Sequence, residues 1–228
     1  MFIAFDPVYF WYVFIPTLLI SIGVQVYLKS TFNKWGQVRN HIGLNGMQVG
    51  QTLFNKTSLK AIPLQPIRGS LNDHFDPRAN VVRLSEPIAG QPSVAAMAVT
   101  AHELGHVQQY QSGSALIKAR GFLLPALQFS PTLSYFALFM GFWFNATGLI
   151  WIGIFFFALM VLFSILTLPV EFDASRRGLK LLREAGLFQN AEDERGARSL
   201  LTAAGLTYLA AAITSILQLL YLIARARR

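Results

Sequence analysis

The chain has 228 residues, of which 54% are apolar and only 13% are charged, against about 25% charged residues in a typical soluble domain. This balance indicates an integral membrane protein, so the excess of 19 Lys and Arg over 11 Asp and Glu favours a lipid bilayer as partner and not nucleic acid. Because the chain has no cysteine, disulfides, thiolate metal sites and cysteine nucleophiles are excluded, and a transition metal must bind histidine and carboxylate side chains.

Four apolar segments are long enough to cross a bilayer, which takes about 20 helical residues. We predict transmembrane helices at residues 8–28, 121–145, 147–169 and 200–224. The first has neither a basic segment before it nor a small-residue cleavage pattern after it, so we interpret it as a retained anchor. The second and third are separated by the polar and glycine residues of "NATG", which suit a tight turn.

The polar segments between these helices are residues 29–120 and 170–199. Because two helices separate them, both are expected on the same side of the membrane. Most of the basic residues that flank the helices lie on this side, so the positive-inside rule predicts that it is cytoplasmic. The basic tail "RARR" stands against this orientation, since four complete spans place it outside.

Local patterns in the first polar segment predict a small domain with helices and strands. A helix is expected after Asn45, which suits an N-cap. The "DPRAN" between "SLNDHF" and "VVRLS" has the composition of a hairpin turn. Ser93 is a suitable N-cap for a helix over about residues 94–111.

The last of these helices carries "VTAHELGHVQQYQSG", with the pattern His-Glu-x-x-His. His102 and His106 are one helical turn apart with roughly 40° between them around the axis, so both imidazoles can reach one ion. Zinc bound by neutral imidazoles lowers the pKa of its bound water to about 7. The spacing makes Glu103 a general base and not a ligand.

The same five residues also occur by chance on helices that bind no metal. Here the flanking residues are apolar and small, which predicts a buried helix, and buried His and Glu side chains are costly without partners. Gly105, an unfavourable residue inside a helix, leaves room beside the histidines for a ligand or another part of the chain.

A hydrolytic zinc site needs a third protein ligand, and the segment "LPVEFDASRRGLKLL" offers two carboxylates. Pro169 is expected to end the third apolar helix, which places Glu171 in the first turn of a new helix. The alternative interpretation is an N-terminal acid that complements the helix macrodipole, and it applies equally to Asp173. Local sequence does not choose between the two.

The run "DHFDPR" offers another candidate for the reaction. His74 could polarise the scissile carbonyl or stabilise the oxyanion, as could Arg78 or Arg177. The alternative is that Asp73, Asp76 and Arg78 build the hairpin turn through side-chain hydrogen bonds.

Three further features lie in the two polar segments. The hairpin is expected to offer an edge strand at residues 81–84, on which an extended peptide substrate could pair. The acidic run at residues 192–194 is expected in the first turn of the last helix, with Asn190 as its cap. His41 is expected to be a solvated loop residue without a role.

Three motifs, "LNDHFDPRANVVRLS", "VAAMAVTAHELGHVQQ" and "LPVEFDASRRGL", occur in this order. Together they resemble the YugP-type neutral zinc metallopeptidases, small bacterial membrane proteins, over essentially the whole chain. A wider likeness is to the HtpX and prenyl-protein endopeptidases, whose HExxH is completed by a Glu in an E-x-x-A-D run. The resemblance implies Glu171 as the third ligand, with Ala174 matching the alanine. Those relatives have Asp where this chain has Ser175, so any support that this Asp gives a metal-binding histidine is expected to come from elsewhere.

We therefore expect a mainly α membrane protein of about four transmembrane helices, with a small α+β zincin-like catalytic domain that contains the HExxH helix and a β-hairpin. Its expected function is that of a gluzincin-like zinc metalloendopeptidase of the bacterial cell membrane, acting on membrane or membrane-proximal proteins. Zinc would bind His102, His106 and Glu171, with Glu103 and His74 as catalytic residues. The alternative is a membrane scaffold or interaction protein with a structural or vestigial zinc site.

Overall fold

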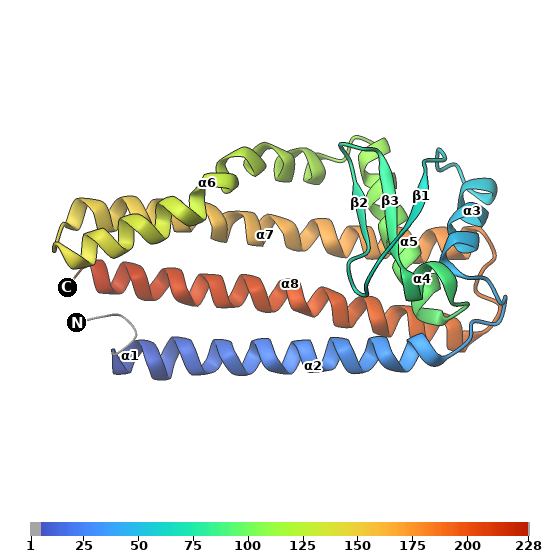
Figure 1. The fold of residues 1–228 in the computed structure, drawn as a ribbon, viewed down its shortest axis with the longest axis horizontal. Coiled ribbons are helices and arrows are strands. Elements are labelled where there is room, and N and C mark those ends of the chain that lie inside the picture. The colour runs from blue at the N-terminus through green and yellow to red at the C-terminus, as the bar shows by residue number, and fades with distance from the viewer. Residues whose placement is uncertain (1–5, 228) are drawn as a thin grey trace. The chain divides into compact units, whose positions relative to one another are not determined.

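A computed structural model describes residues 6–227 and is mainly helical (Figure 1). The chain begins with α1 (Pro7–Tyr9), the π-helix η2 (Phe10–Phe14), α2 (Ile15–Gln37) and α3 (Gly46–Lys56). Next come β1 (Leu64–Ile67), β2 (His74–Asp76), β3 (Val81–Ser85), α4 (Glu86–Gly90) and α5 (Val94–Gln111). Three long helices follow, α6 (Ala115–Trp143), α7 (Thr147–Glu184) and α8 (Ala191–Ala226).

Four helical stretches of the described residues are long and apolar enough to cross a membrane. They are Pro7–Gln37, α6, α7 and α8. Large apolar side chains remain exposed on them, such as Trp11 and Phe122, as expected for surfaces that contact lipid. The prediction of a mainly α protein with four membrane-length helices is confirmed by length and composition.

The described chain divides into two compact units. The helical unit consists of residues 6–25, 118–169 and 206–227, and the mixed unit consists of residues 26–117 and 170–205. The HExxH helix, the strands and Glu171 all belong to the mixed unit. A site built from these residues is therefore contained within one unit.

In the helical unit, α6 and α7 form a close antiparallel hairpin. Its turn contains Asn145 at a φ of 52°, a left-handed conformation that asparagine tolerates. A Cβ on Gly141 would lie 2.7 Å from the backbone nitrogen of Ile150, and the hydroxyl of Ser134 donates to the carbonyl of Gly153 at 2.9 Å. The predicted turn at "NATG" is confirmed.

The mixed unit contains a three-stranded sheet in the order β1-β3-β2. Strand β1 runs parallel to β3, and β2 runs antiparallel to it. Because β3 has a neighbour on each side, the expectation of an edge strand at residues 81–84 is wrong, and the outer strands are β1 and β2. The sheet is drawn beside α5 in Figure 1.

The predicted hairpin turn joins β2 to β3. Asp76 Oδ1 accepts hydrogen bonds from the backbone nitrogens of Arg78 at 2.9 Å and Ala79 at 3.1 Å. The other carboxylate oxygen accepts from Arg83 Nη1 at 2.9 Å, and this bond, with those from the backbone, lowers the pKa of Asp76 to about 2. Asp76 therefore has the turn-building role that the sequence indicated.

Both predicted N-caps of the mixed unit are confirmed. Asn45 and Gln48 form a capping box at the start of α3, and Ser93 Oγ accepts from the backbone nitrogen of Ala96 at 3.0 Å. Helix α5 then passes through the core, where Met97 and Leu104 are fully buried together with Leu84 of β3. This burial holds the face of α5 that carries the histidines in a defined orientation.

Helix α7 continues through Pro169, contrary to the expectation that the helix ends there. Glu171 and Asp173 therefore lie in a helix interior and not in a first turn. The interpretation of either residue as an N-terminal acid that complements the macrodipole is wrong, because that effect is confined to the first turn.

His41 lies in an exposed turn, as expected, but it also contacts residues at the start of α8. Its backbone nitrogen donates to Asp193 Oδ2 at 3.1 Å, and its Nδ1 is 3.3 Å from Asp193 Oδ1. Asn190 Nδ2 lies 2.7 Å from His41 Nε2, while Asn190 Oδ1 accepts from two backbone nitrogens of the first turn, as predicted for the cap. His41 thus connects an early loop to α8.

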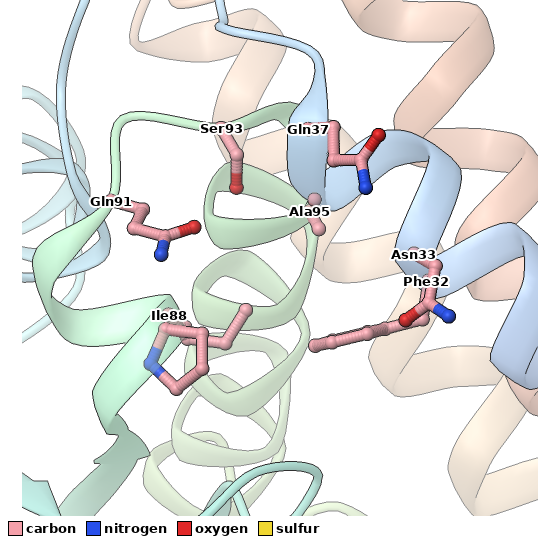
Figure 2. A pocket seen from close by; sticks show the side chains of 9 residues that line it. Phe32, Asn33, Gln37, Ile88, Gln91, Ser93 and Ala95 are labelled. Atoms are coloured by element: carbon pink, nitrogen blue, oxygen red, sulfur yellow. The ribbon is translucent and has the colours of Figure 1, made fainter.

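An open pocket of about 170 Å³ lies between the end of α2 and the start of α5. Figure 2 shows Phe32, Asn33 and Gln37 on one side of the pocket and Ile88 and Gln91 on the other. Its lining contains neither a charged side chain nor a histidine, so it offers no acid, base or metal ligand.

Candidate metal centre

Three potential metal ligands from two helices converge in the mixed unit. His102 and His106 lie on α5 and Glu171 lies on α7, and one ligand atom from each lies within 4.8 Å of the others. Glu171 Oε2 is 3.4 Å from Nε2 of both histidines. Zinc bonds of about 2.0–2.1 Å in a tetrahedral arrangement place neighbouring ligand atoms roughly 3.3 Å apart. The donor set and the two distances to Glu171 therefore fit a zinc ion.

The electrostatics of these side chains also favour a cation. Glu171 is 4% exposed, and its carboxylate faces both imidazoles. Burial is the largest single influence on the pKa of His106 and lowers it. Hydrogen bonding to Glu171 and attraction to Glu103 and Glu171 together outweigh burial, so the pKa of His106 is raised. Two buried carboxylates thus create a negative potential at the point where the ligand atoms meet.

Close packing of α5 against α7 brings the ligands together. A Cβ on Gly105 would overlap the carbonyl oxygen of Ala174, and one on Gly178 would lie 2.5 Å from the carbonyl oxygen of Ala101. Each helix therefore places a glycine against a small residue of the other, which lets the backbones approach. The room beside the histidines that Gly105 provides is occupied by α7, which carries Glu171.

The histidines are also held at their second ring nitrogen. His102 Nδ1 is 3.1 Å from Ser175 Oγ, and His106 Nδ1 is 3.1 Å from Gln109 Oε1. Such contacts fix the orientation of metal-binding histidines. We expected that a residue other than Ser175 would support the metal-binding histidine. This expectation is wrong, because Ser175 itself contacts His102.

Glu171 and Asp173 differ in their contacts. Asp173 accepts hydrogen bonds from Gln109 Nε2 at 2.9 Å, from Arg177 Nε at 2.6 Å and from Arg176, and it does not belong to the group of potential ligands. Gln109 was not singled out by the sequence patterns. Its spacing of three residues from His106, on one face of the helix, is a signal that could have identified it.

Glu103 is 7% exposed, and a strand covers it. Its Oε2 accepts a hydrogen bond from the backbone nitrogen of Phe75 in β2 at 2.9 Å. The Phe75 ring lies against Tyr110 of α5, with centroids 5.7 Å apart. The orientation of the Glu103 carboxylate is thus fixed by β2 and not by α5 alone.

His74 has other partners. Its Nδ1 is 2.8 Å from the carbonyl oxygen of Asn72, and its Nε2 is 3.4 Å from Arg83 Nη1. Because neighbouring residues of a strand point to opposite faces, the His74 side chain lies on the face opposite that of Phe75, which packs against the core. The structure does not bring His74 together with the potential ligands.

A HExxH helix packed against a second helix with a buried glutamate offers the set of two histidines and one glutamate that some catalytic zinc sites use. Residues 10–227 match the family described as "Putative neutral zinc metallopeptidase", and the chain belongs to this family. It is 36% identical over 211 residues to "Putative membrane protease YugP" of Bacillus subtilis (strain 168), covering 92% of this chain and 93% of that relative. No solved structure matches the chain. The resemblance inferred from the three motifs is confirmed.

Proposed function

We propose that the protein is an integral membrane zinc metalloendopeptidase. The observation that carries the proposal is the convergence of His102, His106 and Glu171 at the spacing of zinc ligands. Family membership supports the zinc peptidase class, and the four membrane-length helices support placement in a bilayer. The name of the Bacillus subtilis relative, a membrane protease, supports membrane or membrane-proximal proteins as substrates.

In this mechanism His102, His106 and Glu171 hold the metal, and Glu103 moves the proton. Zinc, when bound, acts as a Lewis acid toward water and the scissile carbonyl. Glu103 accepts a proton from the attacking water and donates it to the leaving amine. The Phe75 amide holds one of its carboxylate oxygens, so the carboxylate does not rotate away between the two transfers. The proposal gives His74 no catalytic role, because its ring is bound to Asn72 and Arg83.

The test combines metal analysis with two variants of the full-length protein in detergent. We expect about one zinc per chain in the wild type. Glu103→Gln should retain the metal and lose cleavage of a broad peptide panel, whereas Glu171→Gln should lose both. Glu184→Gln is the matched control, because Glu184 lies on the same helix, is exposed and pairs with Lys180 at 3.5 Å; it should behave as the wild type.

Two results would redirect the interpretation. Zinc retained at full affinity in Glu171→Gln contradicts the ligand assignment. Zinc binding by wild type and Glu103→Gln without cleavage by either favours the alternative of a scaffold protein with a structural metal.

A further inference from the structure

The amide of Gln109 is completely buried and makes three polar contacts. Its Nε2 donates to the carbonyl oxygen of Val170 at 2.8 Å and to Asp173 Oδ2 at 2.9 Å. Its Oε1 lies 3.1 Å from His106 Nδ1. Both the nitrogen and the oxygen of this buried amide therefore make polar contacts, and the oxygen faces a potential metal ligand.

The partners of Gln109 permit a single orientation of its amide. A backbone carbonyl oxygen can only accept hydrogen bonds, and so can an ionised carboxylate. Asp173 is kept ionised by the guanidinium groups of Arg176 and Arg177. The opposite orientation would place the amide oxygen against these two acceptors and leave buried donors and acceptors unsatisfied, which is costly. The amide nitrogen must face Val170 and Asp173, and the oxygen must face His106.

This orientation determines the tautomer of the histidine. Because the amide oxygen only accepts, His106 Nδ1 must carry the hydrogen, and the lone pair of the neutral ring is then on Nε2. Nε2 is the atom that lies 3.4 Å from Glu171 Oε2. We infer that Gln109, oriented by Val170 and Asp173, is a positioning residue that selects the tautomer of His106 that binds metal through Nε2. The inference rests on the proposed function, since it assumes that His106 is a ligand.

His102 lacks such a selecting contact. Its Nδ1 faces Ser175 Oγ at 3.1 Å, and a hydroxyl can rotate to donate or to accept. The two histidines are thus held by different chemistry: a fixed amide for His106 and an adjustable hydroxyl for His102. Loss of the Gln109 amide should therefore leave the tautomer of His106 unselected.

The test measures zinc affinity of the purified full-length protein by competition with a chromogenic chelator. Gln109→Met keeps the length of the side chain and removes the amide, and we expect it to weaken zinc binding by about 10–100-fold. We also expect a changed visible spectrum when Co²⁺ is bound, because the geometry at His106 is altered. Gln111→Met is the matched control: Gln111 lies on the same helix but bonds to the backbone of Lys60, so its loss should leave both readouts unchanged.

A second variant tests whether Asp173 acts through Gln109. Asp173→Asn replaces a pure acceptor by a group that also donates, so zinc affinity should fall in the wild-type background and fall no further in the Gln109→Met background. Additive losses overturn the inference, as does wild-type zinc affinity in Gln109→Met. If Gln109→Met does not fold, Asp173→Asn alone decides, and unchanged affinity in it overturns the inference.

His106→Ala separates the failure of this inference from that of the proposed function. If His106→Ala binds zinc as tightly as the wild type, the ligand assignment is wrong. If His106→Ala loses zinc and Gln109→Met does not, the metal site stands and the role of Gln109 is wrong.

Discussion

Ser175 contacts a histidine from a position at which the E-x-x-A-D run has Asp. The relatives that complete HExxH with an E-x-x-A-D run have Asp at this position, and the structure places the Ser175 hydroxyl 3.1 Å from His102 Nδ1. A neutral hydroxyl orients the ring but adds less negative charge beside it than a carboxylate would. Ser175, four residues after Glu171 on α7, therefore orients the ring of His102 without adding a negative charge beside it.

We predict that Ser175→Ala lowers zinc affinity by about tenfold, because His102 Nδ1 loses its contact with the Ser175 hydroxyl. Ser175→Asp should bind zinc at least as tightly as the wild type, since a carboxylate is a stronger acceptor for the ring N–H. Both affinities can be measured by chelator competition. Equal affinity in Ser175→Ala and the wild type would show that the contact does not support the metal site.

At the scale of elements, the site depends on how closely α5 and α7 approach. Ala101 and Gly105 of α5 face Gly178 and Ala174 of α7, and the contact between Gly105 and Ala174 lies within one turn of all three ligands. The helices also share the hydrogen bond from Gln109 to the carbonyl of Val170. A change in the distance between the helices would move Glu171 away from both histidines at once.

Gly178→Ala is expected to push the helices apart, because its Cβ would lie 2.5 Å from a backbone oxygen that cannot rotate away. We predict a loss of about 1–3 kcal/mol in the free energy of unfolding, together with weaker zinc binding. Gly36→Ala is the control, since a Cβ there meets nothing within 4 Å and alanine is favoured inside a helix. Thermal unfolding of the metal-free proteins and chelator competition give the two readouts. Wild-type zinc affinity in Gly178→Ala would contradict the argument.

Features of the fold that depend on neighbouring residues could be predicted from the sequence. The caps at Asn45 and Ser93 and the turn at Asp76 were predictable because each hydrogen bond spans only two or three residues. The continuation of α7 through Pro169 was not, because tertiary packing overrides a local helix-breaking preference. The partnership of His41 with Asp193 joins residues 152 positions apart, and no local pattern encodes it.

The same distinction applies to the candidate site. The HExxH spacing identified His102, Glu103 and His106, since one helix carries all three. Glu171 could be chosen over Asp173 only through the resemblance to known peptidases, because both carboxylates lie in the same short run after Pro169. The contact of Ser175 with His102 required the packing of α5 on α7, whereas the contact of Gln109 with His106 lies within α5, and their spacing could have indicated it.

At the scale of the whole molecule, the sequence predicts on which side of the membrane each segment lies. The candidate metal centre belongs entirely to the mixed unit, and most of the basic residues that flank the apolar helices lie in that unit's segments. The positive-inside rule then predicts a cytoplasmic mixed unit, with the turn between α6 and α7 on the outer side. The arginines at 225, 227 and 228 oppose this orientation but are outnumbered.

The absence of cysteine makes this orientation directly testable with single-cysteine variants. Ser70, in the loop between β1 and β2, and Thr147, at the start of α7, are both exposed. In intact cells a membrane-impermeant maleimide should label Thr147→Cys at once and Ser70→Cys only after permeabilisation. The reverse pattern would place the metal centre outside the cytoplasm and the basic tail inside it. The substrates would then have to be sought among extracytoplasmic proteins. Labelling of both variants in intact cells would contradict the placement of the two segments on opposite sides.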